Sequence, residues 1–275
     1  MKPDDNTKRF SGRAFAGRMV KMTAILSVLG LAVVAGDQAR AADTKMKHPD
    51  FTGVWLGFAA LPAGRLGPAT PPLSEKGKAM IKAFTDKYGK DAPESGAYCV
   101  PDGMPAMMTG LAGYPLQVIQ RHDIMAMTSE NEMQLRRIFL DGRKQPEGYP
   151  PTRAGFSVGH WEGNTLVIET KNFLDWPSRR WPRSNAGVIT ERISMTTRDK
   201  INVKNTPFII EKPLNDSVMI DEITVNDPVF TKPAKITVYY QRSSDDNFLE
   251  YDCPVSVWQN VLDEHVAKMK AEGKK

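Results

Sequence analysis

Cysteine and histidine are scarce in this chain, which has two cysteines and four histidines among 275 residues. The histidines form no H-x-H pair or Cys/His cluster, and so the ligands of a zinc-type site are missing. We therefore expect neither a metal nor another cofactor. No apolar run approaches the 20 or so residues that a transmembrane helix needs. The chain also has no internal repeat and no low-complexity tract, which leaves an ordinary globular domain.

An excess of positive charge is found only in the first 41 residues. A basic leader precedes an uncharged, mostly apolar run from Met22 to Ala35, and Ala39-Arg40-Ala41 offers a signal-peptidase site with cleavage after Ala41. This signal peptide, residues 1–41, holds seven Lys and Arg against three acids, which leaves 30 basic and 29 acidic residues in the other 234. A net charge of +1 removes the electrostatic basis for binding nucleic acid. We expect a periplasmic or secreted protein with no membrane span in the mature chain, a single domain over residues 42–275, and no indication of oligomeric state.

The two cysteines, Cys99 and Cys253, are an even and minimal pair. Free thiols are uncommon in oxidising compartments, so we expect one disulfide that joins the early part of the domain to its end. Two separate buried thiols are the alternative.

Alternating apolar and polar residues predict a series of short β-strands joined by turns. Ser74 is a plausible N-cap for a helix that ends near Gly89, and the spacing of apolar residues from Trp258 to Met269 predicts a closing helix. Strands without intervening helices favour an antiparallel architecture over a parallel α/β sheet. The expected strands are 50–55, Leu116–Arg121, Ile124–Glu130, Met133–Asp141, Phe156–Trp161, Thr165–Thr170, Thr190–Thr197, Lys200–Val203, Ser217–Val225, Lys235–Arg242 and Phe248–Cys253.

The first of these strands, with its Gly53-Val54-Trp55, resembles the G-x-W entry strand of lipocalins, and a helix after the last strand fits that group too. Two further lipocalin signatures, a Thr-Asp-Tyr loop and a late arginine that covers the tryptophan, are not recognisable in the sequence. The resemblance implies a mainly β fold, an antiparallel lipocalin-like β-barrel with one helix near each end.

A second resemblance covers nearly the whole mature chain, to a broad group of exported and mostly uncharacterised proteobacterial proteins. It rests on D-F-T-G-x-W, C-x-P-x-G-M-P, R-x-I-x-x-D-G-R and G-x-S-x-G-x-W-E-G-x-T-L-V, which appear here in that order. The resemblance implies export and a β-rich fold rather than a reaction. Many members carry histidine after D-G-R and before E-R, where this chain has Gln145 and Val188-Ile189.

Arginines are dense on the strand that precedes Asp141-Gly142-Arg143. Arg136 and Arg137 are adjacent, so they must point to opposite faces, and one of them is expected to face the barrel interior. An inward arginine must be paired, and Asp141, Glu130 or Glu191 could serve. Such an arginine either stabilises the barrel through a buried ion pair or binds a ligand carboxylate with its planar guanidinium. The sequence leaves both readings open.

His160 and Glu162 lie two residues apart on an expected strand, so their side chains share a face and could exchange a proton. An exposed histidine beside a turn glutamate is the simpler reading. The same stretch contains G-x-S-x-G at Gly155–Gly159. That motif supports a nucleophilic serine only in a strand–turn–helix, and here a hairpin is predicted instead.

Two functions compete for such a barrel. One is a cofactor-independent lyase, decarboxylase or isomerase acting on a small aromatic or hydrophobic carboxylic acid. The other is a non-catalytic periplasmic carrier of a hydrophobic small molecule, and a structural role is a third possibility. For the enzyme, the expected catalytic residues are His160, Asp141, Tyr114 and Tyr149, and the expected substrate-binding residues are Arg136, Arg137, Arg143, Trp161 and Met104.

Overall fold

The computed structural model describes residues 47–61, 63–64, 67–68, 71–90, 100–109, 114–177, 181–203, 213–244, 248–249 and 255–273. The chain divides into two units, Met1–Thr44 and Lys45–Lys275, and every described residue belongs to the second. The expected signal peptide and its cleavage site therefore lie outside the described residues, as do both cysteines of the expected disulfide.

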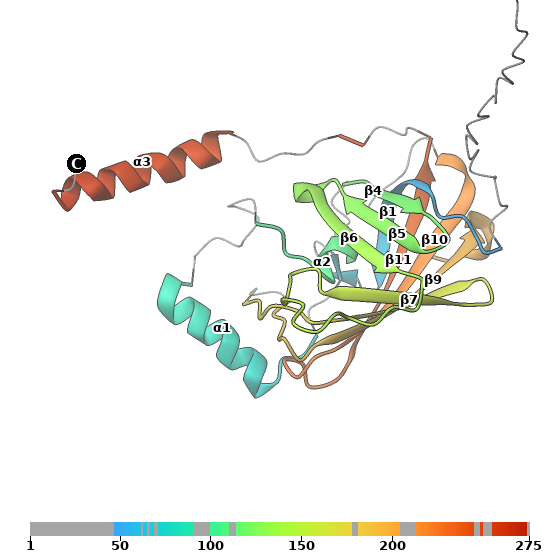
Figure 1. Ribbon diagram of the computed structural model, residues 1–275, viewed down its shortest axis with the longest axis horizontal. Helices are drawn as coiled ribbons and strands as arrows, with labels where there is room; N and C mark the ends of the chain where they lie inside the picture. The colour runs from blue at the N-terminus through green and yellow to red at the C-terminus, as the bar shows by residue number, and fades with distance from the viewer. Residues whose placement is uncertain are drawn as a thin grey trace, which may run out of the picture. The chain divides into compact units, whose positions relative to one another are not determined.

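The described part of the chain is mainly β (Figure 1). Its elements are β1 (Gly53–Leu61), β2 (Ala63–Gly64), β3 (Gly67–Pro68), α1 (Glu75–Tyr88), α2 (Ala106–Thr109), β4 (Leu116–Gln120), β5 (Ile124–Ser129), β6 (Gln134–Phe139), β7 (Phe156–Glu162), β8 (Thr165–Lys171), β9 (Val188–Thr197), β10 (Pro213–Asn226), β11 (Ala234–Ser243) and α3 (Val255–Ala271).

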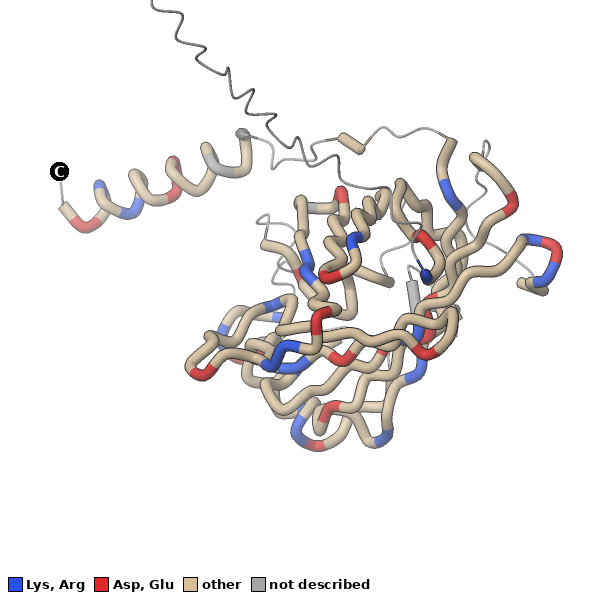
Figure 2. Tube along the Cα trace, turned by 45° about the vertical axis from the view of Figure 1, so that its right-hand side comes forward, with Lys and Arg blue, Asp and Glu red and all other residues tan. Residues whose placement is uncertain are grey.

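Nine of the described strands close into one barrel, in the order β1-β11-β10-β9-β8-β7-β6-β5-β4, with β4 pairing back onto β1. The predicted β-barrel with a helix near each end is confirmed, and it has one strand more than the eight of lipocalins. Alternate residues of each strand face a core that includes Trp55, Met125, Met127 and Ile193, all fully buried. Acidic and basic residues are interspersed around the barrel rather than gathered on one side (Figure 2).

One strand pair departs from the antiparallel expectation. β6 and β7 run parallel and pair only at Ile138 with Ser157 and at Phe139 with Val158. A crossover connection over residues 140–155 joins them, which meets the dozen or more residues that a parallel pair requires. Among the described strands, the first four residues of β6 therefore have a neighbour only in β5. We call this the open seam of the barrel.

Two local predictions from the sequence are also wrong. Residues 200–203 form no strand, because Arg198–Lys200 make a 3-10 turn. The side chains of Ile201 and Val203 pack against an apolar cluster around Phe58, but their backbones do not pair with a neighbouring strand. The Gly-, Pro- and Met-rich segment 93–113, which its composition predicts to be a loop, contains the short helix α2, whose Met107 and Met108 are buried. Most of the expected strand 248–253 lies outside the described residues.

The N-terminus of α1 is capped as predicted. Ser74 Oγ accepts a hydrogen bond from the Gly77 N–H at 3.2 Å, and the hydroxyl donates to the Pro228 carbonyl at 2.6 Å, which ties the helix to the β10–β11 connection. Loss of an N-cap hydroxyl typically costs about 1 kcal/mol. We expect Ser74→Ala to lower the free energy of unfolding by about that amount in denaturant titration. Ser74→Thr keeps the hydroxyl and should retain most of the stability, whereas equal losses in both variants would contradict the cap assignment.

Candidate functional site

A cleft of about 560 Å³ opens in the barrel wall at the open seam. Residues of β6 line one side, and the end of the crossover connection with the start of β7 lines the other. The lining includes the outward side chains of Leu135 and Phe139 and the inward Arg136 and Ser157, so the cleft runs into the wall rather than along the barrel axis. The remaining described lining residues are Pro101, Gly103, Met107, Met133, Gln134, Arg137, Tyr149, Pro151, Thr152, Arg153, Ala154, Gly155, Phe156 and Leu174.

The charge of this lining has one sign. Three arginines, Arg136, Arg137 and Arg153, contribute to it, and no aspartate or glutamate is among the described lining residues. Arg137 is exposed, and Arg153 lies 5.7 Å from the Trp176 ring centroid in a cation–π arrangement. Neither guanidinium forms an ion pair within the described chain. Two arginine forks without carboxylate partners favour an anionic ligand.

Aromatic rings line the same cleft and form a wall of Phe139, Phe156 and Tyr149. The ring centroids of Phe139 and Phe156 are 5.2 Å apart, and Tyr149 meets Phe156 edge-on at 5.1 Å. Three of the exposed large apolar side chains in the described structure, Met133, Leu135 and Leu174, also line the cleft. Exposed apolar surface gathered at a concave site is typical of a place where a ligand binds.

Behind the cleft, six neighbouring strands each contribute one inward polar side chain. We call this set the polar belt: Arg136 (β6), Ser157 (β7), Thr170 (β8), Glu191 (β9), Asp221 (β10) and Tyr240 (β11), all buried. Arg136 donates to Glu191 at 2.8 Å and through a second, shorter contact, which makes the pair bidentate. It also donates to Ser157 at 3.0 Å and to Thr170 at 2.8 Å. Four donors of the guanidinium are thus occupied inside the barrel.

Asp221 is the member of the polar belt whose carboxyl oxygens have no hydrogen-bond partner among the described residues. Its complete burial, followed by the nearby negative charge of Glu191, raises the pKa of Asp221 well above its ordinary value. This shift favours the protonated form of the carboxyl group in the folded protein. Burial also raises the pKa of Tyr240, whose hydroxyl donates to the Met108 carbonyl.

The structure distinguishes the two adjacent arginines of β6. Arg136 points inward and pairs with Glu191, which was one of the partners considered from the sequence, while Arg137 points outward into the cleft. Tyr149 lines the same cleft. Of the residues predicted for substrate binding or proton transfer, these three are the ones brought together here.

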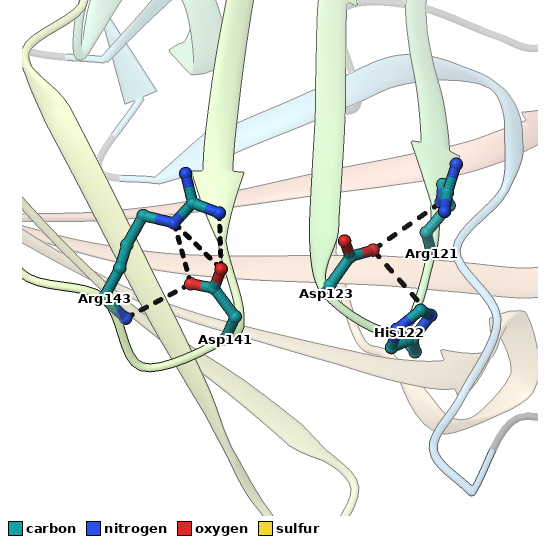
Figure 3. A network of polar contacts seen from close by, with 5 residues as sticks. All are labelled: Arg121, His122, Asp123, Asp141 and Arg143. Atoms are coloured by element: carbon teal, nitrogen blue, oxygen red, sulfur yellow. Dashed lines mark hydrogen bonds and ion pairs between the residues drawn. The ribbon is translucent and has the colours of Figure 1, made fainter.

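Asp141 and Arg143 lie at the end of β6, outside the cleft lining (Figure 3). Arg143 Nε donates to both carboxylate oxygens of Asp141 at 2.9 Å, and the guanidinium lowers the pKa of Asp141 to about 2. The neighbouring β4–β5 turn carries a second group, in which Asp123 contacts Arg121 and His122. An exposed, ion-paired carboxylate of such low pKa is a poor proton carrier near neutral pH.

His160 faces outward on β7, away from the polar belt. It meets Glu162 at 3.3 Å, and Glu162 also pairs with Arg192 at 2.9 Å. The Arg192 hydrogen bond first, and His160 second, lower the pKa of Glu162. This arrangement corresponds to the simpler reading of an exposed histidine beside a turn glutamate.

The other predicted site residues also lie away from the cleft lining. Trp161 stacks on His48 with ring centroids 4.4 Å apart, and Met104 is fully buried. The Met104 carbonyl accepts a hydrogen bond from Arg183, whose pKa burial lowers to about 10. Tyr114 is half-buried and is not among the lining residues.

Sequence reasoning missed three informative residues. Asp221 lies between Met219 and Ile223 among the alternate residues of β10 that face the core. An acid at such a position could have been recognised from the sequence as a buried polar residue. Arg153 sits in a proline-rich connection that offers no periodicity. Arg242 lies over the Trp55 ring at 6.0 Å, so the late arginine that the sequence did not reveal is present after all.

Comparison with known proteins gives no family: no protein-family model matches the chain, and no curated protein matches it. Within the described residues, no group of three or more His, Cys, Asp or Glu side chains is arranged to hold a metal ion. None of the described helices has the length and apolar character needed to cross a membrane.

Proposed function

We propose that this protein binds a small aromatic or hydrophobic carboxylic acid in the cleft at the open seam, as a periplasmic carrier. The observation that carries the proposal is the combination of two unpaired arginines, Arg137 and Arg153, with an aromatic wall and no lining carboxylate among the described residues. An anion would gain charge-assisted hydrogen bonds, and its apolar body would displace water from the rings. The volume of about 560 Å³ lies within the range of small-molecule sites.

Binding is favoured over the catalytic alternative by the position of the titratable groups. A cofactor-independent lyase or isomerase needs a proton-transfer group at the ligand. Tyr149 is the one tyrosine in the described lining, which contains no histidine or carboxylate. Glu191 and Asp221 are fully buried behind Arg136. Turnover of a bound acid that is abolished by Tyr149→Phe would favour the enzyme instead.

We expect 3-phenylpropanoate to raise the melting temperature of the protein and to bind measurably by calorimetry, and Arg137→Met or Arg153→Met to weaken this binding about 10- to 100-fold. That range corresponds to the loss of one charge-assisted hydrogen bond. Arg192→Met is the matched control, because Arg192 lies outside the cleft and pairs with Glu162. Equal loss of binding in all three variants, or none in the two cleft variants, would contradict the site.

A further inference from the structure

We infer that the ligand of the cleft carries an amide group next to its carboxylate, as in an N-acylated amino acid, and that this amide pairs with the free backbone edge of β6. The inference rests on the proposed function and specifies its ligand class. It comes from the open seam, where a row of backbone donors and acceptors borders the same cleft as Arg137 and Arg153.

The edge of β6 is open over residues 134–137. On one side these residues pair with 126–129 of β5, and on the other side pairing with β7 begins only at Ile138. Since backbone groups of a strand point alternately to its two sides, two of these four residues direct their N–H and C=O groups toward the cleft. Buried or half-buried backbone groups are nearly always paired, so an open edge of this kind favours a partner with complementary amide groups.

The segments across the cleft direct their own backbone groups elsewhere. The N–H of Thr152 donates to the Asn172 carbonyl at 3.1 Å, and Thr152 forms an isolated parallel bridge with Phe173. The Arg153 carbonyl accepts from the Met104 N–H at 3.2 Å. From the loop before α2, the Gly103 N–H donates to the side chain of Gln134, not to its backbone. No described segment therefore completes the edge.

The size and charge of the site limit what can add to this edge. Four strand residues at about 3.3 Å per residue span roughly 10 Å from first to last, which leaves room for the roughly 6 Å of an extended N-acetylated amino acid. The carboxylate of such a ligand would lie at Arg137 or Arg153, and its apolar side chain would meet the wall formed by Phe139, Phe156 and Tyr149. A ligand without an amide would leave the edge to water.

Three probes separate the amide from the rest of the ligand: N-acetylphenylalanine, 3-phenylpropanoate, which lacks the acetamido group, and N-acetyl-N-methylphenylalanine, which lacks the amide N–H. We expect N-acetylphenylalanine to bind about threefold to tenfold more tightly than 3-phenylpropanoate, as one backbone hydrogen bond from the amide N–H would give, and N-methylation to remove the gain. Hydrogen exchange should slow across residues 134–137 with N-acetylphenylalanine beyond any slowing with 3-phenylpropanoate. Both acids should weaken in parallel in Arg137→Met.

Equal affinity of the first two probes with no added protection of residues 134–137 would overturn the amide inference and leave carboxylate binding at the cleft intact. If none of the probes binds, the proposed function fails, and the amide inference fails with it. If N-acetyl-N-methylphenylalanine binds as tightly as N-acetylphenylalanine, the gain comes from added apolar contact, and the pairing with β6 is wrong.

Discussion

Substitution of Arg136 by methionine is expected to lower the free energy of unfolding by about 3–5 kcal/mol, the usual cost of removing one partner of a buried ion pair. Arg136 is 2% exposed, and its guanidinium is hydrogen-bonded to Glu191, Ser157 and Thr170 on three neighbouring strands. Without it, the Glu191 carboxylate would be left buried and uncompensated beside Asp221. Chemical denaturation monitored by tryptophan fluorescence would measure the loss.

The neighbouring Arg137→Met is the control for this substitution, because Arg137 is exposed and should change stability by less than about 0.5 kcal/mol. Removing both charges in Arg136→Met with Glu191→Met should recover a large part of the loss, since replacement of a complete buried pair by apolar residues is often neutral. Glu191→Gln offers a milder test if Arg136→Met does not fold. If Arg136→Met and Glu191→Gln each lower the free energy of unfolding by less than about 1 kcal/mol, the structural role of the polar belt is contradicted.

Asp221→Asn is expected to stabilise the protein progressively as the pH rises above about 4. Burial raises the pKa of Asp221 well above the ordinary 3.8, so the folded protein keeps a proton that the unfolded chain releases. The folded state then binds more protons, and its stability falls with rising pH by up to about 1.4 kcal/mol per pH unit, until the pH passes the raised pKa. Asparagine mimics the neutral carboxyl group and removes this loss.

The measurement is the difference in free energy of unfolding between Asp221→Asn and the parent protein from pH 4 to pH 9. We expect the difference to be small at pH 4 and to grow toward high pH. Asp216→Asn, an exposed substitution on the same strand, should show no such trend. A constant difference across the pH range, or destabilisation that increases with pH, would show that Asp221 is ionised in the folded protein.

Much of the barrel follows from local sequence patterns. Alternating apolar residues located β4 to β11 to within a few residues, because each of these strands buries one face in a common core. The helix α1 was predictable from Ser74 and Gly89, whose capping roles depend on residues close by in the chain. The opposite orientations of Arg136 and Arg137 follow from the two-residue period of a strand.

The site itself depended on long-range pairing that has no local signature. The parallel register of β6 and β7 depends on how the 140–155 connection returns to the barrel, which the alternating pattern of either strand does not show. Arg153 reaches the cleft only because that connection ends there. His160 and Trp161 lie away from this cleft, since the strand directs His160 to solvent and packs Trp161 on His48.

The most direct test of the account is a crystal structure of the protein with 3-(4-iodophenyl)propanoate, located by the anomalous signal of its iodine. We predict a single strong peak against the wall of Phe139, Phe156 and Tyr149, with the carboxylate at Arg137 or Arg153. A peak among the inward side chains of the barrel, beside Ile193 or Met219 for example, or no peak at saturating ligand, would contradict a binding site at the open seam.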